Sequence, residues 1–229
     1  MMADVDVASP AALIGDPTRA EFLLALSEKE ALPASALARR AGVSNSTASI
    51  QLGKLLAGGL LEVERHGRHR YYRLRDPAVA QAIEALALIA PERPVASLRD
   101  ANRAEGIQLA RTCYDHLAGA LGVALLDVLL ESGAFIARGS DLELTPHGLD
   151  RLDSLGVDVE GARRSRRAFA SLCLDWSERR YHVAGALGAA LTKRLFELDW
   201  IERPGPGRAV RVTPAGRTGF RRIGVEPPR

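Results

Sequence analysis

The stretch Val43-Ser44-Asn45-Ser46-Thr47-Ala48-Ser49-Ile50-Gln51-Leu52-Gly53-Lys54-Leu55-Leu56 decides how the first part of this 229-residue chain folds. Ser44 is a good helix N-cap, because its hydroxyl can accept a hydrogen bond from the free amide groups of a first turn. Ala48, Leu52 and Leu55 then recur at helical spacing and form an apolar stripe. The opposite face carries short polar side chains and one cation: Asn45, Ser46, Ser49, Gln51 and Lys54. Such a face suits a helix that enters a DNA groove and bonds to phosphates and base edges.

The residues before this stretch predict a helix-turn-helix. Residues 34–41 form a short helical pattern that ends at Gly42, where a positive φ costs little. Two helices joined by a tight glycine-containing turn are typical of this motif, whose second helix enters the groove.

An oxygen-bearing cap followed by proline marks five expected helix starts: Ser9-Pro10, Asp16-Pro17, Asp76-Pro77, Thr145-Pro146 and Thr213-Pro214.

A basic β-hairpin is expected directly after the polar helix. Residues 60–65 and 70–74 alternate as two strands around the turn His66-Gly67-Arg68-His69. Such a hairpin could simply cover the core, but beside a helix-turn-helix it predicts a wing that reaches phosphates or a minor groove. We therefore expect ten residues to contact double-stranded DNA: Ser44, Asn45, Ser46, Thr47, Ser49, Gln51, Lys54, Arg65, Arg68 and Arg70.

Four short motifs together resemble the ArsR-type winged helix-turn-helix repressors. They are Ile14-Gly15-Asp16-Pro17-Thr18-Arg19, Leu37-Ala38-Arg39-Arg40-Ala41-Gly42-Val43-Ser44, the Ser46-Thr47 pair and Gly59-Leu60-Leu61 before the basic hairpin. The resemblance covers roughly residues 9–90. It implies a homodimeric bacterial transcription regulator that releases DNA on binding an inducer, with the helix after Pro77 in the dimer interface. The apolar stripe of Ile83, Leu86 and Ile89 suits that role and equally suits packing within one chain.

The metal sites of that family are missing at their usual positions. Metal-sensing members carry a Cys-x-Cys pair on the helix before the recognition helix, or Asp/His pairs on the helix after the wing. Residues 34–41 contain no cysteine, and residues 76–90 contain no histidine. The thiolate and imidazole ligands that soft and borderline metals require are therefore absent there, and we carry over no metal site from the resemblance.

Composition bounds the rest of the chain. An apolar fraction of 47% is ample for buried cores, and the length favours two domains, expected at residues 1–92 and 93–229. The net charge is only +3, but arginines cluster locally, which attracts polyanions. The sequence has no apolar run of membrane-spanning length, no secretion signal and only two cysteines. We expect a cytoplasmic protein with reduced thiols and no membrane partner.

The second half contains an internal duplication. Residues 116–125 and 182–191 agree at eight of ten positions. Each is followed by an apolar helical stretch, an expected hairpin and a Thr-Pro-x-Gly helix start. The expected fold class is mainly α with small β-hairpins (α+β). An N-terminal winged helix-turn-helix precedes a C-terminal domain of two duplicated helix–hairpin units, at about 113–150 and 173–220.

Candidate sensing residues surround these repeats. On expected helices, Cys113 lies one turn from His116, while Asp175, Arg179 and His182 share a face. If the two units pack about a pseudo-twofold axis, the two histidines approach each other with both cysteines nearby. The candidate effector-binding set is Cys113, Tyr114, His116, Cys173, Asp175, Trp176, Arg179 and His182.

Three interpretations of this set stay open. The first is a buried network in which Asp175 pairs with Arg179. The second is a pocket for a small organic effector, lined by Tyr114, Trp176 and Tyr181. The third is a Cys/His site for a metal ion or for thiol redox chemistry.

The sequence favours a regulator over an enzyme. We predict a sequence-specific DNA-binding repressor that is released by an effector bound in its C-terminal domain. One rival is a C-terminal enzyme that uses Cys113 or Cys173 as a nucleophile beside a histidine. Against it, the sequence has no Gly-rich phosphate loop, no nucleophile elbow and no metalloprotease motif. The other rival is an architectural DNA-binding protein without a sensory response.

Overall fold

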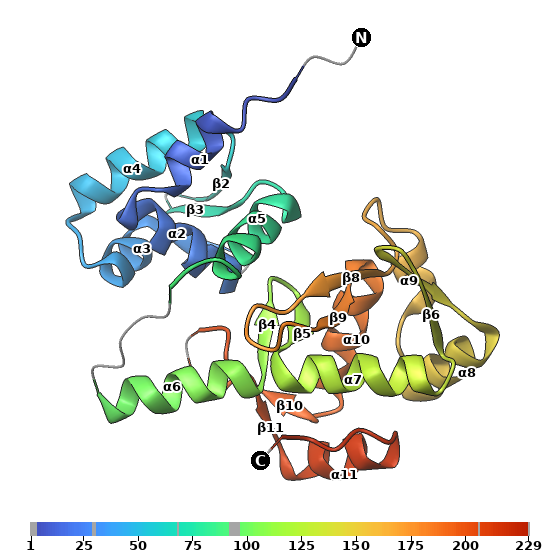
Figure 1. Cartoon of the computed structure of the whole chain (residues 1–229). Helices are drawn as coiled ribbons and strands as arrows, with labels where there is room; N and C mark the ends of the chain where they lie inside the picture. Colours follow the sequence, from blue (N-terminus) through green and yellow to red (C-terminus); the bar gives the residue numbers. More distant parts are fainter. Residues whose placement is uncertain (1–3, 29–30, 68, 92–96, 206, 229) are drawn as a thin grey trace. The chain divides into compact units, whose positions relative to one another are not determined.

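The computed structural model describes residues 4–28, 31–67, 69–91, 97–205 and 207–228. They form two compact units, Met1–Leu86 and Ala87–Arg229, which we describe separately (Figure 1). The first unit thus ends at Leu86, whereas the sequence-based boundary was residue 92. Arg68, one of the expected DNA contacts, lies outside the described residues.

The first unit is a winged helix-turn-helix. Its helices are α1 (Ala8–Ile14), α2 (Pro17–Glu28), α3 (Ala34–Ala41), α4 (Asn45–Ala57) and α5 (Pro77–Ala87). Its strands are β1 (Leu32–Pro33), β2 (Leu61–His66) and β3 (His69–Leu74), and they form an antiparallel sheet in the order β1-β3-β2. Fully buried side chains from α2, α3 and α4 form the core: Phe22, Leu23, Leu26, Leu37, Ala48, Leu52 and Leu55. The stripe expected on α4 is therefore part of the core.

Side-chain caps begin the helices at four of the five expected positions. The capping oxygens that accept amide hydrogen bonds there belong to Asp16, Asp76, Thr145 and Thr213. The expectation at Ser9 is wrong, because α1 already begins at Ala8. The carboxylate of Asp6 accepts hydrogen bonds from the amides of both residues, so an aspartate two residues upstream of Ala8 takes the place of the serine cap.

The second unit contains short strands and helices that alternate along the chain. Its helices are α6 (Leu98–Leu109), α7 (Gly119–Glu131), α8 (Pro146–Leu155), α9 (Val159–Arg163), α10 (Gly185–Glu197) and α11 (Pro214–Arg222). Its strands are β4 (Arg111–Cys113), β5 (His116–Ala118), β6 (Phe135–Arg138), β7 (Asp141–Leu144), β8 (Ser171–Leu174), β9 (Tyr181–Ala184), β10 (Ile201–Glu202) and β11 (Arg211–Val212). They form antiparallel sheets in the orders β4-β5, β6-β7-β8-β9 and β10-β11. None of the helices in the described part of the chain has the length and hydrophobicity of a membrane span.

The duplication is visible in the order of the elements. Hairpin, helix, hairpin and helix follow one another from β4 to α8 and again from β8 to α11. The central helices α7 and α10 each span 13 residues. A Cβ placed on Gly122 of α7 would lie 3.5 Å from the Cβ of His182, and one on Gly188 of α10 would lie 3.3 Å from the Cβ of His116. Each repeat's helix therefore packs against the other repeat's hairpin, which is the expected pseudo-twofold arrangement.

The helices expected around the cysteines are wrong, because both segments are β-hairpins. Cys113 ends β4 and His116 begins β5, with Tyr114 between them at a φ of 59°. Cys173 and His182 lie on β8 and β9. The strands have three or four residues each, which is too short for an alternating pattern to be distinguished from a helical one.

Candidate functional site

The polar face of α4 is exposed at most of the expected contact positions: Ser44, Asn45, Ser46, Thr47, Ser49 and Lys54. The Ser44 hydroxyl accepts a hydrogen bond from the Thr47 amide at 3.1 Å, which fixes the first turn. The sequence-based set did not include Ile50, which is 62% exposed on the same helix. Its position outside the apolar stripe was the available signal. An exposed apolar side chain among polar ones suits contact with a thymine methyl group.

Gln51 differs from the other expected DNA contacts, because its side chain is half-buried and already accepts a hydrogen bond within the protein. Its Oε1 accepts a hydrogen bond from Arg19 Nη1 at 2.9 Å. Arg19 also donates to the backbone oxygens of Ala12 and Leu13, so one buried guanidinium joins α1, α2 and α4. The oxygen of Gln51 thus helps to hold α4 in place.

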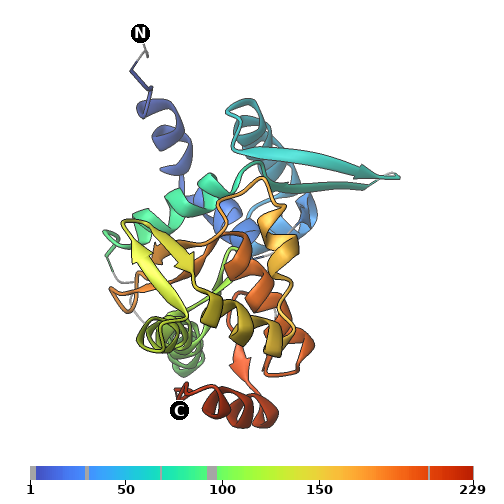
Figure 2. The same ribbon diagram turned by 90° about the vertical axis from the view of Figure 1, so that its right-hand side faces the viewer.

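The hairpin β2–β3 carries unpaired positive charge near its tip. Figure 2 shows the two strands as a long ribbon that projects from the helices of the first unit. Arg65 lies directly opposite Arg70, and both are exposed. Neither has an ion pair with another described residue, whereas Arg73 is paired with Glu62 and Glu64 at 2.9 and 2.7 Å. Like charges in opposing positions destabilise a hairpin unless an anion lies near them.

Comparison with known proteins identifies the family. A model described as a helix-turn-helix domain matches residues 14–64. An uncharacterized HTH-type transcriptional regulator of Bacillus subtilis (strain 168), YdfF, is 45% identical over 215 residues, which are 94% of this chain and 95% of the relative. The chain belongs to the HTH-type transcriptional regulators. It is therefore a DNA-binding protein of transcription regulation.

Solved structures similar to this regulator cover a smaller part of it. The transcriptional repressor BigR from Xylella fastidiosa is 29% identical, with a TM-score of 0.36, over 38% of this chain and 88% of its own. The homodimeric winged helix-turn-helix domain of Mb0332 from Mycobacterium bovis, a possible ArsR-family regulator, is 27% identical, with a TM-score of 0.34, over 39% and 89%.

A second candidate site lies inside the C-terminal unit, where four side chains converge. The strand register puts Cys113 opposite His116 and Cys173 opposite His182, so each repeat contributes one cross-strand pair. One ligand-type atom from each residue lies within 4.8 Å of the others. The two Sγ atoms are 3.9 Å apart, and the imidazole centroids are 5.2 Å apart. We call these four residues the Cys/His cluster.

Both imidazoles of the cluster are buried, and each has a carboxylate at one nitrogen. His116 Nδ1 lies 3.2 Å from Asp115 Oδ1. His182 Nδ1 lies 3.4 Å from Asp175 Oδ2, within ion-pair distance but without hydrogen-bond geometry. The Nε2 atoms of both histidines are buried and have no hydrogen-bond partner among the described residues. Each imidazole therefore has one nitrogen beside a carboxylate and one nitrogen without a hydrogen-bond partner among the described residues.

Burial and neighbouring charges shift the pKa values in and around the cluster. The hydrogen bond with Cys173, together with burial, raises the pKa of Cys113 to about 12. Burial disfavours the charged form of His116, but Cys113 and then Asp115 outweigh it and raise the pKa of His116 to about 9. Burial alone would raise the pKa of Asp175, yet its contacts with His182 and Arg111 hold that pKa far below its usual range.

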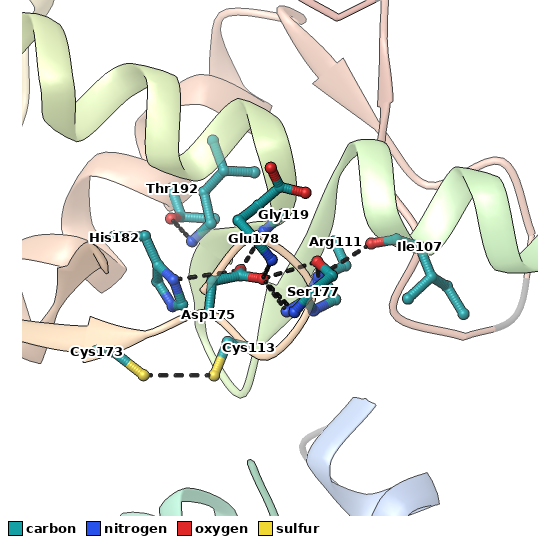
Figure 3. A network of polar contacts seen from close by, with 11 residues as sticks. Ile107, Arg111, Cys113, Gly119, Cys173, Asp175, Ser177, Glu178, His182 and Thr192 are labelled. Carbon is teal, nitrogen blue, oxygen red and sulfur yellow. Dashed lines mark hydrogen bonds and ion pairs between the residues drawn. The ribbon is translucent and has the colours of Figure 1, made fainter. Parts of the chain in front are cut away.

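The partner of Asp175 is Arg111, and the expected pairing with Arg179 is wrong. Arg111 Nη2 donates to Asp175 Oδ1 at 2.8 Å, and both side chains are fully buried (Figure 3). The Ser177 hydroxyl and the Gly119 amide also donate to this carboxylate, at 2.8 and 2.7 Å. Arg179 is an exposed loop residue with a φ of 55°. The available signal for Arg111 was its place two residues before Cys113, which puts both on one face of a strand.

Of the aromatic residues expected to line an effector pocket, Trp176 lies beside two arginines and Tyr181 is exposed to solvent. The Arg111 and Arg208 guanidinium carbons lie 4.7 and 5.9 Å from the Trp176 ring centroid, and Tyr181 is half exposed. A pocket of about 270 Å³ is lined instead by residues around α9 and α10, such as Asp158, Lys193 and Glu197. None of the eight candidate residues lines that pocket.

Proposed function

We propose that this regulator is a homodimeric ArsR-type repressor that holds its operator with α4 and the wing. The observation that carries the proposal is the exposed polar face of α4 together with the opposed arginines Arg65 and Arg70, which have no counter-charge among the described residues. Ser46, Thr47 and Ser49 contact base edges or position the helix in the major groove. Asn45, Lys54, Arg65 and Arg70 contact phosphates.

Dimerisation is the second part of the proposal. Leu86 on α5 is 43% exposed, and Ile89 is 81% exposed, so both apolar side chains gain from being covered. A two-fold dimer places two recognition helices on one face of the duplex. Its operator is therefore an imperfect palindrome with half-sites about one helical turn apart.

The third part is release of DNA when the C-terminal unit binds an effector. This unit has its own core. It also contains buried polar side-chain atoms that have no hydrogen-bond partner among the described residues, and native interiors contain few such atoms. The enzyme alternative requires a thiolate nucleophile, and the raised pKa of Cys113 disfavours a thiolate at that position.

Salt-dependent DNA binding tests the proposal. An operator is first selected from random duplexes with the full-length protein, and affinity is then followed by fluorescence anisotropy over a range of salt. The double variant Arg65→Ala/Arg70→Ala loses two phosphate contacts, so its log–log salt slope falls by about 2 and its affinity drops for all sequences. The control is Arg138→Ala, which removes an exposed arginine from the end of β6 in the other unit. An unchanged slope in the double variant would refute the wing assignment.

A further inference from the structure

We propose that the Cys/His cluster binds one zinc ion, which joins the two repeats of the C-terminal unit. The four ligands are Cys113, His116, Cys173 and His182. This inference does not depend on DNA binding, since it rests on the interior of the second unit alone.

The spacing of the four residues fits a tetrahedral ion. With Zn–S bonds of about 2.3 Å, tetrahedral geometry holds two sulfurs about 3.8 Å apart. The Sγ atoms of Cys113 and Cys173 are 3.9 Å apart. Zn–N bonds of about 2.05 Å hold two nitrogens about 3.3 Å apart, and all four ligand atoms already lie within 4.8 Å of one another. Two thiolates and two imidazoles are also a donor set that zinc takes in structural sites.

Unsatisfied atoms give an independent reason for a ligand here. A buried ring nitrogen without a hydrogen bond is costly, and native interiors rarely tolerate two of them side by side. Nε2 of His116 and Nε2 of His182 are both in this state among the described residues. A metal ion between the two rings removes both costs at once.

The surroundings of the rings suit the same ion. Metal-binding histidines commonly present their second ring nitrogen to a carboxylate, which fixes the orientation of the ring. Asp115 and Asp175 occupy these positions, at 3.2 and 3.4 Å from the Nδ1 atoms. We therefore assign Nε2 of each histidine as the ligand atom and the two aspartates as positioning residues.

Zinc explains the cluster better than a Cys113–Cys173 disulfide does. A disulfide needs an oxidant and leaves both Nε2 atoms without a partner. Zinc binding needs only that the two thiols lose their protons as the Zn–S bonds form, with no change of oxidation state. With four protein ligands the site is closed, and each repeat supplies half of it. The ion therefore acts as a cross-link between the two repeats.

The test uses the full-length protein, reduced and stripped with a chelator, and titrated with Co²⁺ as a spectroscopic substitute for zinc. We expect saturation at one ion per chain, with the visible bands of tetrahedral cobalt and a thiolate-to-cobalt charge-transfer band. The Cys113→Ser/Cys173→Ser variant loses the charge-transfer band. The matched control His147→Asn, which changes an exposed histidine of the same unit, leaves the spectrum unchanged. A cobalt spectrum without thiolate ligation, or with the same band in the double variant, overturns the proposal.

A measurement on the unaltered protein covers the case in which the cysteine variants fail to fold. Because zinc binds the folded state, saturating Zn²⁺ should raise the unfolding temperature of the stripped protein, and excess chelator should reverse the rise. Native mass spectrometry should show one zinc per chain. An unfolding temperature that zinc leaves unchanged, or a Cys113–Cys173 disulfide in protein purified without reductant, counts against the site.

Discussion

Two hairpins of this regulator share a local plan and lie in opposite environments. In the wing, β2–β3 places His66 opposite His69, and both are exposed. In the second unit, β4–β5 places Cys113 opposite His116, and both are buried. Both pairs come last before the turn, so the local geometry of the two sites is alike.

The difference shows that the environment of a hairpin decides its chemistry. The wing holds like charges opposite each other in water, so it gains from a polyanion that comes from outside. The β4–β5 hairpin places Cys113 and His116 in the interior of the second unit, where each buried polar atom needs a partner. One hairpin is suited to recognition at a surface and the other to an internal site.

The largest expected effect is a loss of stability on replacing a buried strand arginine, compared with an exposed one. Arg111→Ala leaves the buried carboxylate of Asp175 without its ion pair, so the free energy of unfolding of the second unit should fall by about 3–5 kcal/mol. Arg70→Ala, on the exposed hairpin, should change stability by less than about 0.5 kcal/mol. Urea denaturation followed by circular dichroism measures both. Equal losses of unfolding free energy in the two variants would contradict the contrast between the exposed and the buried hairpin.

An intermediate effect is expected from glycines inside the helices beside these hairpins. A Cβ on Gly122 of α7 would lie 2.5 Å from the backbone oxygen of Leu117, whereas one on Gly53 of α4 would have nothing within 4 Å. Gly122→Ala should therefore cost about 1–3 kcal/mol through overpacking. Gly53→Ala should stabilise the first unit by up to about 1 kcal/mol through helix propensity. Thermal unfolding of the two variants tests this, and a stabilised Gly122→Ala protein would contradict the tight packing of α7 against Leu117.

The smallest expected effect concerns the wing histidines. The variant His66→Asn/His69→Asn should remain within about 0.5 kcal/mol of the parent protein in urea denaturation, since both side chains are exposed. It should also bind cobalt with the same spectrum, because its substitutions lie outside the Cys/His cluster. Loss of cobalt binding in this variant would place the ligands in the wing and remove the contrast between the two hairpins.

Much of the first unit could be predicted because its signals are local. The cap at Ser44, the end of α3 at Gly42 and the burial of Leu52 follow from interactions within a few residues. The duplication could also be predicted, because two similar segments fold alike and pack symmetrically. The likeness of the segments around His116 and His182 predicted that the two histidines lie near each other if the repeats pack about a pseudo-twofold axis, and their ring centroids are 5.2 Å apart.

The sequence by itself determined the helix-turn-helix, the wing and the repeat, since periodicity and capping act between near neighbours. Only the tertiary structure decided that Asp175 pairs with Arg111, 64 residues away, and that Gln51 is held by Arg19 across 32 residues. It also decided that the Cys/His segments are strands, because three-residue strands are stabilised by the chain beside them. Contacts between distant residues depend on packing, which local patterns do not encode.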